Sequence, residues 1–146
     1  MFTNENKFNE PIFSISTAAR ILNISVHTLR MYEREGLFIS FKNNSNQRLF
    51  SQSDIERIQC IRTAINEAGI SISGIKTIYS LIPCWKIKGC LEEDRKKCDA
   101  YNNSHVPCWS YEHKNFCKDK NCRECEVYYK YSQCGAIKEL IKSISR

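Results

Sequence analysis

Residues 27–37 read HTLRMYEREGL, and this stretch has the pattern of a short amphipathic helix. Ser25 stands before it as a helix cap, and Gly36 stands where the helix should stop. Val26 and Leu29 are three residues apart and fall on the side that faces a core. The outward-facing positions are then His27, Thr28, Arg30, Met31 and Arg34.

The preceding segment, FSISTAARILNIS at residues 13–25, predicts a second short helix. Either Ser14 or Ser16 can cap it, and Asn23 closes it. Its inward face carries Ala18, Ala19 and Leu22. Two short helices joined by about three residues form a helix-turn-helix pattern.

After these helices, residues 38–50 carry apolar residues on both sides of the polar turn KNNSNQ, which predicts a β-hairpin. Ser51 or Ser53 then caps a longer helix that ends at Gly69. Its core-facing stripe consists of Ile55, Ile58, Ile61 and Ile65. A further short helix is expected over residues 73–82.

Helix, turn, helix, hairpin and helix is the order of a winged helix, in which the second helix enters the major groove and the wing touches the flanking backbone. The guanidinium groups of Arg30 and Arg34 can bind phosphate or the edge of guanine with paired hydrogen bonds. Lys42 and Arg48 flank the hairpin tip, where a wing would meet phosphate. The residues therefore favour binding to double-stranded DNA.

The same stretches resemble the DNA-binding domain of the mercury-resistance-regulator (MerR) family, from Phe13 to Ile82. HTLRMYEREGL is similar to the recognition-helix signature of that family. NQRLFSQSDIERI is similar to the wing end and the start of the third helix, and AGISISGIKTI to the junction between the third and fourth helices.

This resemblance implies DNA contacts from Arg30 and Tyr32 on the recognition helix and a phosphate contact from Arg48 on the wing. Tyr32 can instead cover the core, and Arg34 can instead pair with a glutamate. The chain departs from the family at the wing start, where Lys42 stands in place of an arginine and lacks its bidentate geometry. Together the predicted DNA contacts are His27, Thr28, Arg30, Tyr32, Arg34, Lys42 and Arg48.

Cysteine is the outlier in the composition, because the chain contains nine and eight of them lie between Cys84 and Cys134. Aliphatic residues nearly vanish between Pro83 and Val127, so this segment cannot bury enough surface to offset its ordering entropy. Thiolate-bound metal can supply the missing stability, and either zinc or an iron–sulfur cluster accepts such ligands. The candidate ligands are Cys84, Cys90, Cys98, Cys108, Cys117, Cys122, Cys125 and Cys134.

The segments CWKIKGC, CDAY, PCW and CRECEVYY, between about residues 84 and 129, are similar to the cysteine-rich two-CW domain of bacterial signalling and regulatory proteins. This resemblance implies a metal-binding or redox-responsive module. Cys134 lies outside the pattern, whereas the other seven cysteines of this segment fall on it.

The final segment, CGAIKELIKSISR, predicts a short amphipathic helix that packs either on its own domain or on a partner subunit. Its apolar face would carry Ile137, Leu140, Ile141 and Ile144. The expected fold class is thus mainly α: a winged helix-turn-helix with a β-hairpin wing, then a small irregular cysteine-rich domain, then a C-terminal amphipathic helix. The expected bounds are residues 12–82, 84–134 and 135–146.

The formal net charge of +6 is a mild bias towards polyanions and does not identify one. No apolar run approaches the roughly 18 residues of a membrane span, and the N-terminal residues lack the apolar core of a signal peptide, so a cytoplasmic location is expected. No Cys-His-Asp arrangement or nucleotide-binding loop is visible, so an enzyme is not expected.

The sequence therefore predicts a sequence-specific DNA-binding transcription regulator, controlled through a cysteine-ligated metal, an iron–sulfur cluster or a redox site. The alternative is a DNA-binding regulator with a purely structural zinc module, and a redox enzyme anchored on DNA is disfavoured. The MerR resemblance implies a homodimer on an inverted-repeat promoter site, activation by distortion of that DNA, and RNA polymerase as a further partner.

Overall fold

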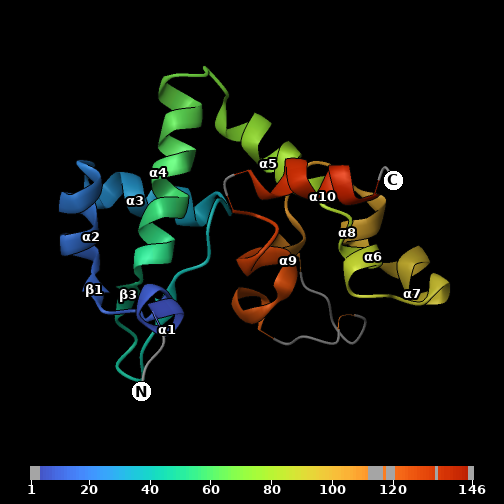
Figure 1. Cartoon of the computed structure of the whole chain (residues 1–146), viewed down its shortest axis with the longest axis horizontal. Helices are drawn as coiled ribbons and strands as arrows, with labels where there is room; N and C mark the ends of the chain where they lie inside the picture. The colour runs from blue at the N-terminus through green and yellow to red at the C-terminus, as the bar shows by residue number, and fades with distance from the viewer. Residues whose placement is uncertain (1–3, 112–116, 118–120, 134, 145–146) are drawn as a thin grey trace. The chain divides into compact units, whose positions relative to one another are not determined.

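The computed structural model describes residues 4–111, 117, 121–133 and 135–144. The chain is mainly helical and divides into two compact units, Met1–Ile70 and Ser71–Arg146. The first unit contains α1 (Asn4–Asn9), β1 (Phe13–Ser14), α2 (Ile15–Leu22), α3 (Val26–Arg34), β2 (Phe41–Lys42), β3 (Arg48–Phe50) and α4 (Gln52–Asn66) (Figure 1). This order confirms the predicted winged helix-turn-helix.

The two short helices are held at their ends by side-chain caps. The hydroxyl of Ser14 accepts a hydrogen bond from the backbone N–H of Thr17, and the hydroxyl of Ser25 accepts one from Thr28. Between the helices, Asn23 adopts the left-handed conformation with φ of 56°, which ends α2. Of the two predicted caps for α2, Ser14 is therefore the one used.

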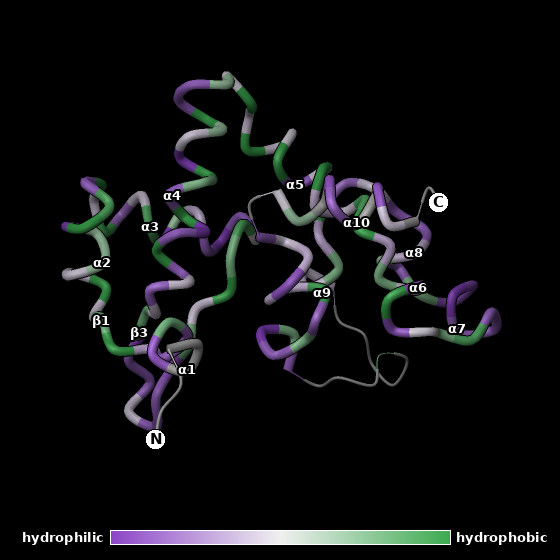
Figure 2. Tube along the Cα trace, in the orientation of Figure 1, coloured by the Kyte–Doolittle hydropathy of each residue, from purple (hydrophilic) through white to green (hydrophobic). Residues whose placement is uncertain are grey.

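The core of the first unit lies where α2, α3 and α4 meet the sheet. Its buried apolar residues are Ala18, Ala19, Leu22, Leu29, Tyr32, Leu37, Phe38, Phe50, Ile55, Ile58 and Ile61. The rings of Phe38 and Phe50 pack with centroids 5.9 Å apart. A reciprocal capping box of Ser51 and Asp54 begins α4. Hydropathy alternates along this helix because only one face is buried (Figure 2).

A small antiparallel sheet of order β1-β3-β2 forms the wing and ties it to the start of α2. Phe13 pairs with Phe50, and Lys42 pairs with Arg48. The predicted hairpin is confirmed, whereas β1 and α1 were not predicted. At the wing tip, the side-chain oxygen of Asn43 accepts hydrogen bonds from backbone N–H groups of the turn, which fixes the turn without an Asn-Gly pair.

The second unit consists of short helices joined by irregular backbone, as expected of the cysteine-rich segment. Its elements are α5 (Ile72–Ser80), α6 (Cys84–Ile87), α7 (Glu92–Lys97), α8 (Asp99–Asn102), the 3₁₀ turns η1 (Cys108–Ser110) and η2 (Cys122–Glu124), α9 (Glu126–Tyr129) and α10 (Ala136–Ile144). The helix α10 confirms the predicted C-terminal helix. The side chains of its expected apolar face lie outside the described residues.

The core of the second unit is small and joins α5 to the cysteine-rich segment. Ile82, Cys125 and Val127 are buried together, and half-buried Tyr79 packs against them. The helix α5 therefore belongs to this unit, although its sequence continues the winged-helix pattern. A domain boundary at Pro83 stays a prediction. Within the described residues, no helix has the length and apolar character to cross a membrane.

Candidate nucleic-acid interface and thiol pocket

The recognition-helix candidate α3 presents one charged face to solvent. Leu29 and Tyr32 are buried, whereas His27, Arg30 and Arg34 are exposed. These three exposed positions recur every three or four residues, so they lie along one side of the helix. This arrangement places two guanidinium groups and an imidazole where a duplex could meet them.

Two of the predicted DNA contacts, His27 and Thr28, differ in their surroundings. The Thr28 hydroxyl lies 2.9 Å from the hydroxyl of Ser25, and the backbone N–H of Thr28 is also bound by that cap. His27 stands next to it with an exposed side chain. Thr28 therefore supports the start of the helix, and His27 is better placed to meet a base.

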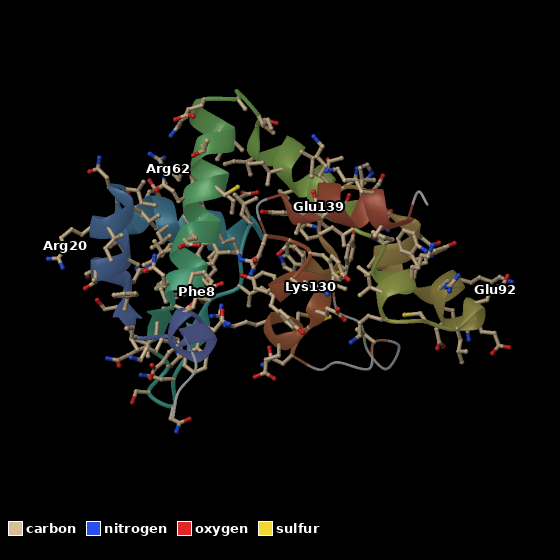
Figure 3. All side chains as sticks on the ribbon, in the orientation of Figure 1. Phe8, Arg20, Arg62, Glu92, Lys130 and Glu139 are labelled. Atoms are coloured by element: carbon tan, nitrogen blue, oxygen red, sulfur yellow. The ribbon has the colours of Figure 1, made fainter. Side chains whose placement is uncertain are left out.

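Tyr32 lies in the core, with a side chain that is 3 % exposed. Its hydroxyl accepts a hydrogen bond from Nη1 of Arg62 on α4 at 3.3 Å (Figure 3 labels Arg62). The residue thus joins α3 to the helix behind it. Its direct contact with DNA stays a prediction, and burial of the ring supports the alternative interpretation that it covers the core.

Arg48 on β3 is bound to the recognition helix. Its Nε donates to Oε2 of Glu33 at 2.7 Å, and the two side chains are 32 % and 20 % exposed. This hydrogen bond uses one of the five N–H donors of the guanidinium, so a phosphate could still be bound by the others. Glu33 was missed in the sequence because the pair is separated by 15 positions.

Lys42 is exposed and lies directly opposite Arg48 in the wing. Like charges at directly opposed positions of a sheet repel each other. Glu33 offsets the charge of Arg48, and an anion bound at the wing would offset the charge of Lys42. The wing thus presents the exposed charge of Lys42 beside an arginine whose own charge is offset by Glu33.

Residues 13–81 match the model of the MerR HTH family regulatory protein. The N-terminal half is thus similar to the helix-turn-helix domain of the MerR family. Within it, the chain is 34 % identical over 71 residues to the heat shock protein HspR of Streptomyces coelicolor, covering 49 % of this chain and 47 % of the relative.

Two further relatives match the same MerR-type domain. The transcriptional regulator GlnR of Bacillus cereus is 27 % identical over 74 residues, covering 51 % of this chain and 57 % of the relative. The uncharacterized transcriptional regulator YyaN of Bacillus subtilis is 37 % identical over 65 residues, covering 44 % and 46 %. The chain spans about half the length of each of these relatives, and none of their names specifies a catalytic activity.

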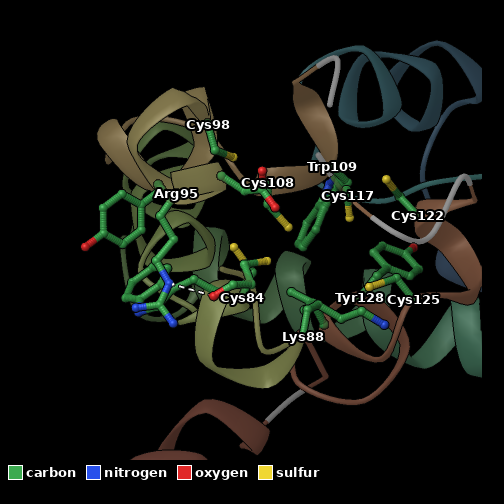
Figure 4. Close-up of a pocket in the computed structure, with 15 residues that line it drawn as sticks. Cys84, Lys88, Arg95, Cys98, Cys108, Trp109, Cys117, Cys122, Cys125 and Tyr128 are labelled. Carbon is green, nitrogen blue, oxygen red and sulfur yellow. Dashed lines mark hydrogen bonds between the residues drawn. The ribbon is translucent and has the colours of Figure 1, made fainter. Parts of the chain in front are cut away.

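In the second unit, seven cysteines line one pocket, which contains about 610 Å³ of empty space that is partly open to solvent. They are Cys84, Cys90, Cys98, Cys108, Cys117, Cys122 and Cys125, and none of these seven forms a disulfide (Figure 4). Arg95 and Lys88 line the same pocket, and Nε of Arg95 donates to the backbone carbonyl of Cys90 at 3.1 Å. Cys134, the eighth predicted ligand, lies outside the described residues.

The thiols in this pocket affect one another. A hydrogen bond with Cys108 holds the pKa of the Cys84 thiol below its usual value. The same hydrogen bond, followed by burial, raises the pKa of Cys108, and the neighbouring thiols of Cys84, Cys122 and Cys125 raise it further. Burial raises the pKa of Cys90, with Cys84, Cys117 and Cys98 as the next contributors.

The donor set of the pocket fits a thiophilic metal, because thiolate sulfur is the ligand shared by structural zinc and iron–sulfur clusters. Among the described residues, however, no group of three or more potential ligands is arranged to hold a single ion. The pocket gathers the predicted ligands without presenting a finished tetrahedral site. Cys60, in the MerR-type domain, is disulfide-bonded.

A row of aromatic rings connects the pocket to α5. The ring centroids of Tyr79 and Trp109 are 5.4 Å apart, and those of Trp109 and Tyr128 are 5.1 Å apart. Trp109 and Tyr128 line the thiol pocket, and Tyr79 lies on α5. Sequence periodicity could not reveal this row, since it depends on residues far apart in the chain.

Proposed function

We propose that this protein is a sequence-specific transcription regulator that binds double-stranded DNA through α3 and the wing and is controlled through the thiol pocket. The observation that carries DNA binding is the exposed face of α3 in a MerR-type domain, with Arg30 and Arg34 on one side of a capped helix. Arg30 would bind a base edge or phosphate, and Arg48 and Lys42 would bind phosphates that flank it.

Duplex affinity tests this part of the proposal. The full chain is used to select duplexes from a randomised pool, and affinity for the selected duplex is measured as salt is varied. Arg30→Ala should weaken binding by about 1–3 kcal/mol, roughly five- to 150-fold. Lys96→Ala is the matched control, because Lys96 lies on exposed α7. Unchanged affinity in an Arg30→Ala, Arg48→Ala double variant would overturn the proposal.

Control through the pocket is supported by the position of α5. This helix lies inside the family match, at residues 13–81, yet its Tyr79 packs on Trp109 of the pocket lining. A change in the pocket would therefore move or stiffen a helix that continues directly from the DNA-binding segment. Zinc or an iron–sulfur cluster held by the pocket cysteines would stabilise this unit, and a cluster would add a redox response.

A purely structural zinc module is the second candidate, and the small core of the second unit favours it. Few apolar side chains are buried there, so a bound metal could serve only to keep the unit folded. In that case metal loading would not alter DNA affinity once α5 is folded. The two candidates therefore differ in whether metal loading changes the affinity for DNA.

The variant Tyr79→Leu distinguishes control through the pocket from a structural module. Tyr129→Leu is the control, because Tyr129 is 50 % exposed and lies on α9. Under control through the pocket, metal loading changes the DNA affinity of the wild-type protein, and Tyr79→Leu reduces that change while metal content is kept. The control variant should respond as the wild type does. An affinity that is the same with and without metal would support the structural module instead.

The proposed DNA site is an inverted repeat bound by a homodimer, because two copies of one recognition helix require two half-sites. RNA polymerase would then respond to the shape of the promoter. Sedimentation of the protein with duplexes that carry one or two half-sites tests this arrangement. Binding of one chain per duplex on the two-half-site DNA would contradict it.

A further inference from the structure

The turn between β2 and β3, at the tip of the wing, is held by one asparagine side chain. Oδ1 of Asn43 accepts hydrogen bonds from the backbone N–H of Ser45 at 3.0 Å and from that of Gln47 at 2.9 Å. Nδ2 of Asn43 donates to Oε1 of Gln47 at 3.1 Å. Both lone pairs of Oδ1 are therefore used inside the turn, and the side chain is half-buried there.

The backbone of the same turn is ordered as well. The N–H of Asn46 donates to the carbonyl of Asn43 at 2.9 Å, and the N–H of Asn43 donates to the carbonyl of Gln47 at 3.0 Å. Asn46 adopts the left-handed conformation with φ of 61°, which asparagine tolerates better than most residues. The turn thus has one specified conformation, although residues 44–47 at its tip are exposed.

The other end of the wing is bound to the recognition helix. Nε of Arg48 on β3 donates to Oε2 of Glu33 on α3 at 2.7 Å, and Lys42 lies opposite Arg48 and directly before Asn43. A cation on a flexible loop loses conformational entropy when it binds a phosphate, whereas a cation on an ordered loop avoids most of that loss. The order of this turn should therefore contribute to the affinity that Lys42 provides.

We propose that Asn43 is a positioning residue for DNA binding, which orders the wing in the free protein so that Lys42 meets a phosphate next to the groove that α3 enters. Asn43 acts through the turn and does not itself contact DNA, because its acceptor atom is already used by Ser45 and Gln47. This inference rests on the proposed DNA binding and adds a residue to it that the recognition-helix and wing motifs do not assign.

A double-variant cycle with Lys42 tests the proposal on the full chain and its selected duplex. Asn43→Ala should weaken duplex affinity about two- to tenfold, the fold-change that corresponds to one net hydrogen bond. Lys42→Ala should weaken it too, but by a smaller factor in the Asn43→Ala background, because a disordered turn no longer holds Lys42 at the phosphate. Losses that multiply, as a direct DNA contact of Asn43 would give, overturn the proposal, and so does unchanged affinity in Asn43→Ala.

The order of the free turn is the second readout, measured by NMR relaxation of the Ser45 and Gln47 amides. Their order parameters should be near about 0.85 in the wild type and should fall below about 0.6 in Asn43→Ala. Asn43→Asp keeps the acceptor oxygen and should restore the order, whereas Asn44→Ala, at the exposed neighbouring position, should leave it unchanged. Equal mobility of these amides in the wild type and in Asn43→Ala would contradict the positioning role.

Failure of this inference can be distinguished from failure of the proposed function. A wild-type chain without salt-sensitive affinity for any duplex would overturn both. Affinity that depends on Arg30 but not on Asn43 would overturn only the positioning role. Amide exchange in α2 to α4 should be the same in the wild type and in the Asn43 variants, which ties any loss of affinity to the wing turn rather than to unfolding.

Discussion

The first unit buries eleven apolar side chains among its described residues, whereas the second buries six, and one of those six is the cysteine Cys125. The first unit also begins its helices α2, α3 and α4 with side-chain caps, while α6, α7 and α8 have none. The first unit therefore has the means to fold on apolar burial and local hydrogen bonds. The second must draw on another source of stability, and its thiols are the available one.

Removal of bound metal should have the largest effect on stability, and it should destabilise only the second unit. Chelation under anaerobic conditions should abolish slow amide exchange in α6 to α9 and preserve it in α2 to α4. The reason is that thiolate-bound zinc contributes roughly 10–16 kcal/mol in small domains, whereas the first unit does not depend on it. Hydrogen exchange read by mass spectrometry measures both units in one sample, and chelator with excess zinc is the control. Equal loss of protection in the two units would remove the contrast between them.

A cavity in the apolar core should have the next largest effect on stability, and it should destabilise the first unit. Phe50 is fully buried against Phe38, so Phe50→Ala should destabilise the first unit by about 3–5 kcal/mol. Phe41→Ala is the matched control, because Phe41 is 37 % exposed on the wing. Urea unfolding followed by exchange in α2 to α4 gives the measurement. A small effect of Phe50→Ala would show that apolar burial does not dominate this unit.

The same contrast explains what the sequence could predict. In the first unit, Ser25 and Gly36 mark the ends of α3 locally, and the isoleucine stripe of α4 shows its buried face, so the winged helix was predicted correctly. The ion pair of Glu33 and Arg48 was missed because it joins two elements across 15 positions. Propensity and periodicity report on neighbours in the chain and carry no information on such pairs.

In the second unit, the sequence predicted which residues are candidate ligands but not how they are arranged. The clustering of cysteines in the sequence predicted ligands, and seven of them do line one pocket. The packing of α5 on Trp109 could not be predicted, since it joins Tyr79 to a residue far away in the chain. The sequence pattern of α5 followed the winged helix, while its packing follows the thiol pocket.

The smallest expected effect concerns the link between wing and recognition helix. Glu33→Gln keeps an acceptor for Nε of Arg48 but removes the charge, so it should lower stability by no more than about 1 kcal/mol, because the pair is partly exposed. The variant should bind duplex DNA more tightly at low salt, since Arg48 is no longer neutralised and the carboxylate no longer repels phosphate. Glu56→Gln is the control, because Glu56 is an exposed glutamate on α4. If both variants bind DNA equally tightly, the carboxylate of Glu33 does not face the bound phosphate, and Arg48 is a structural residue of the wing rather than a DNA contact.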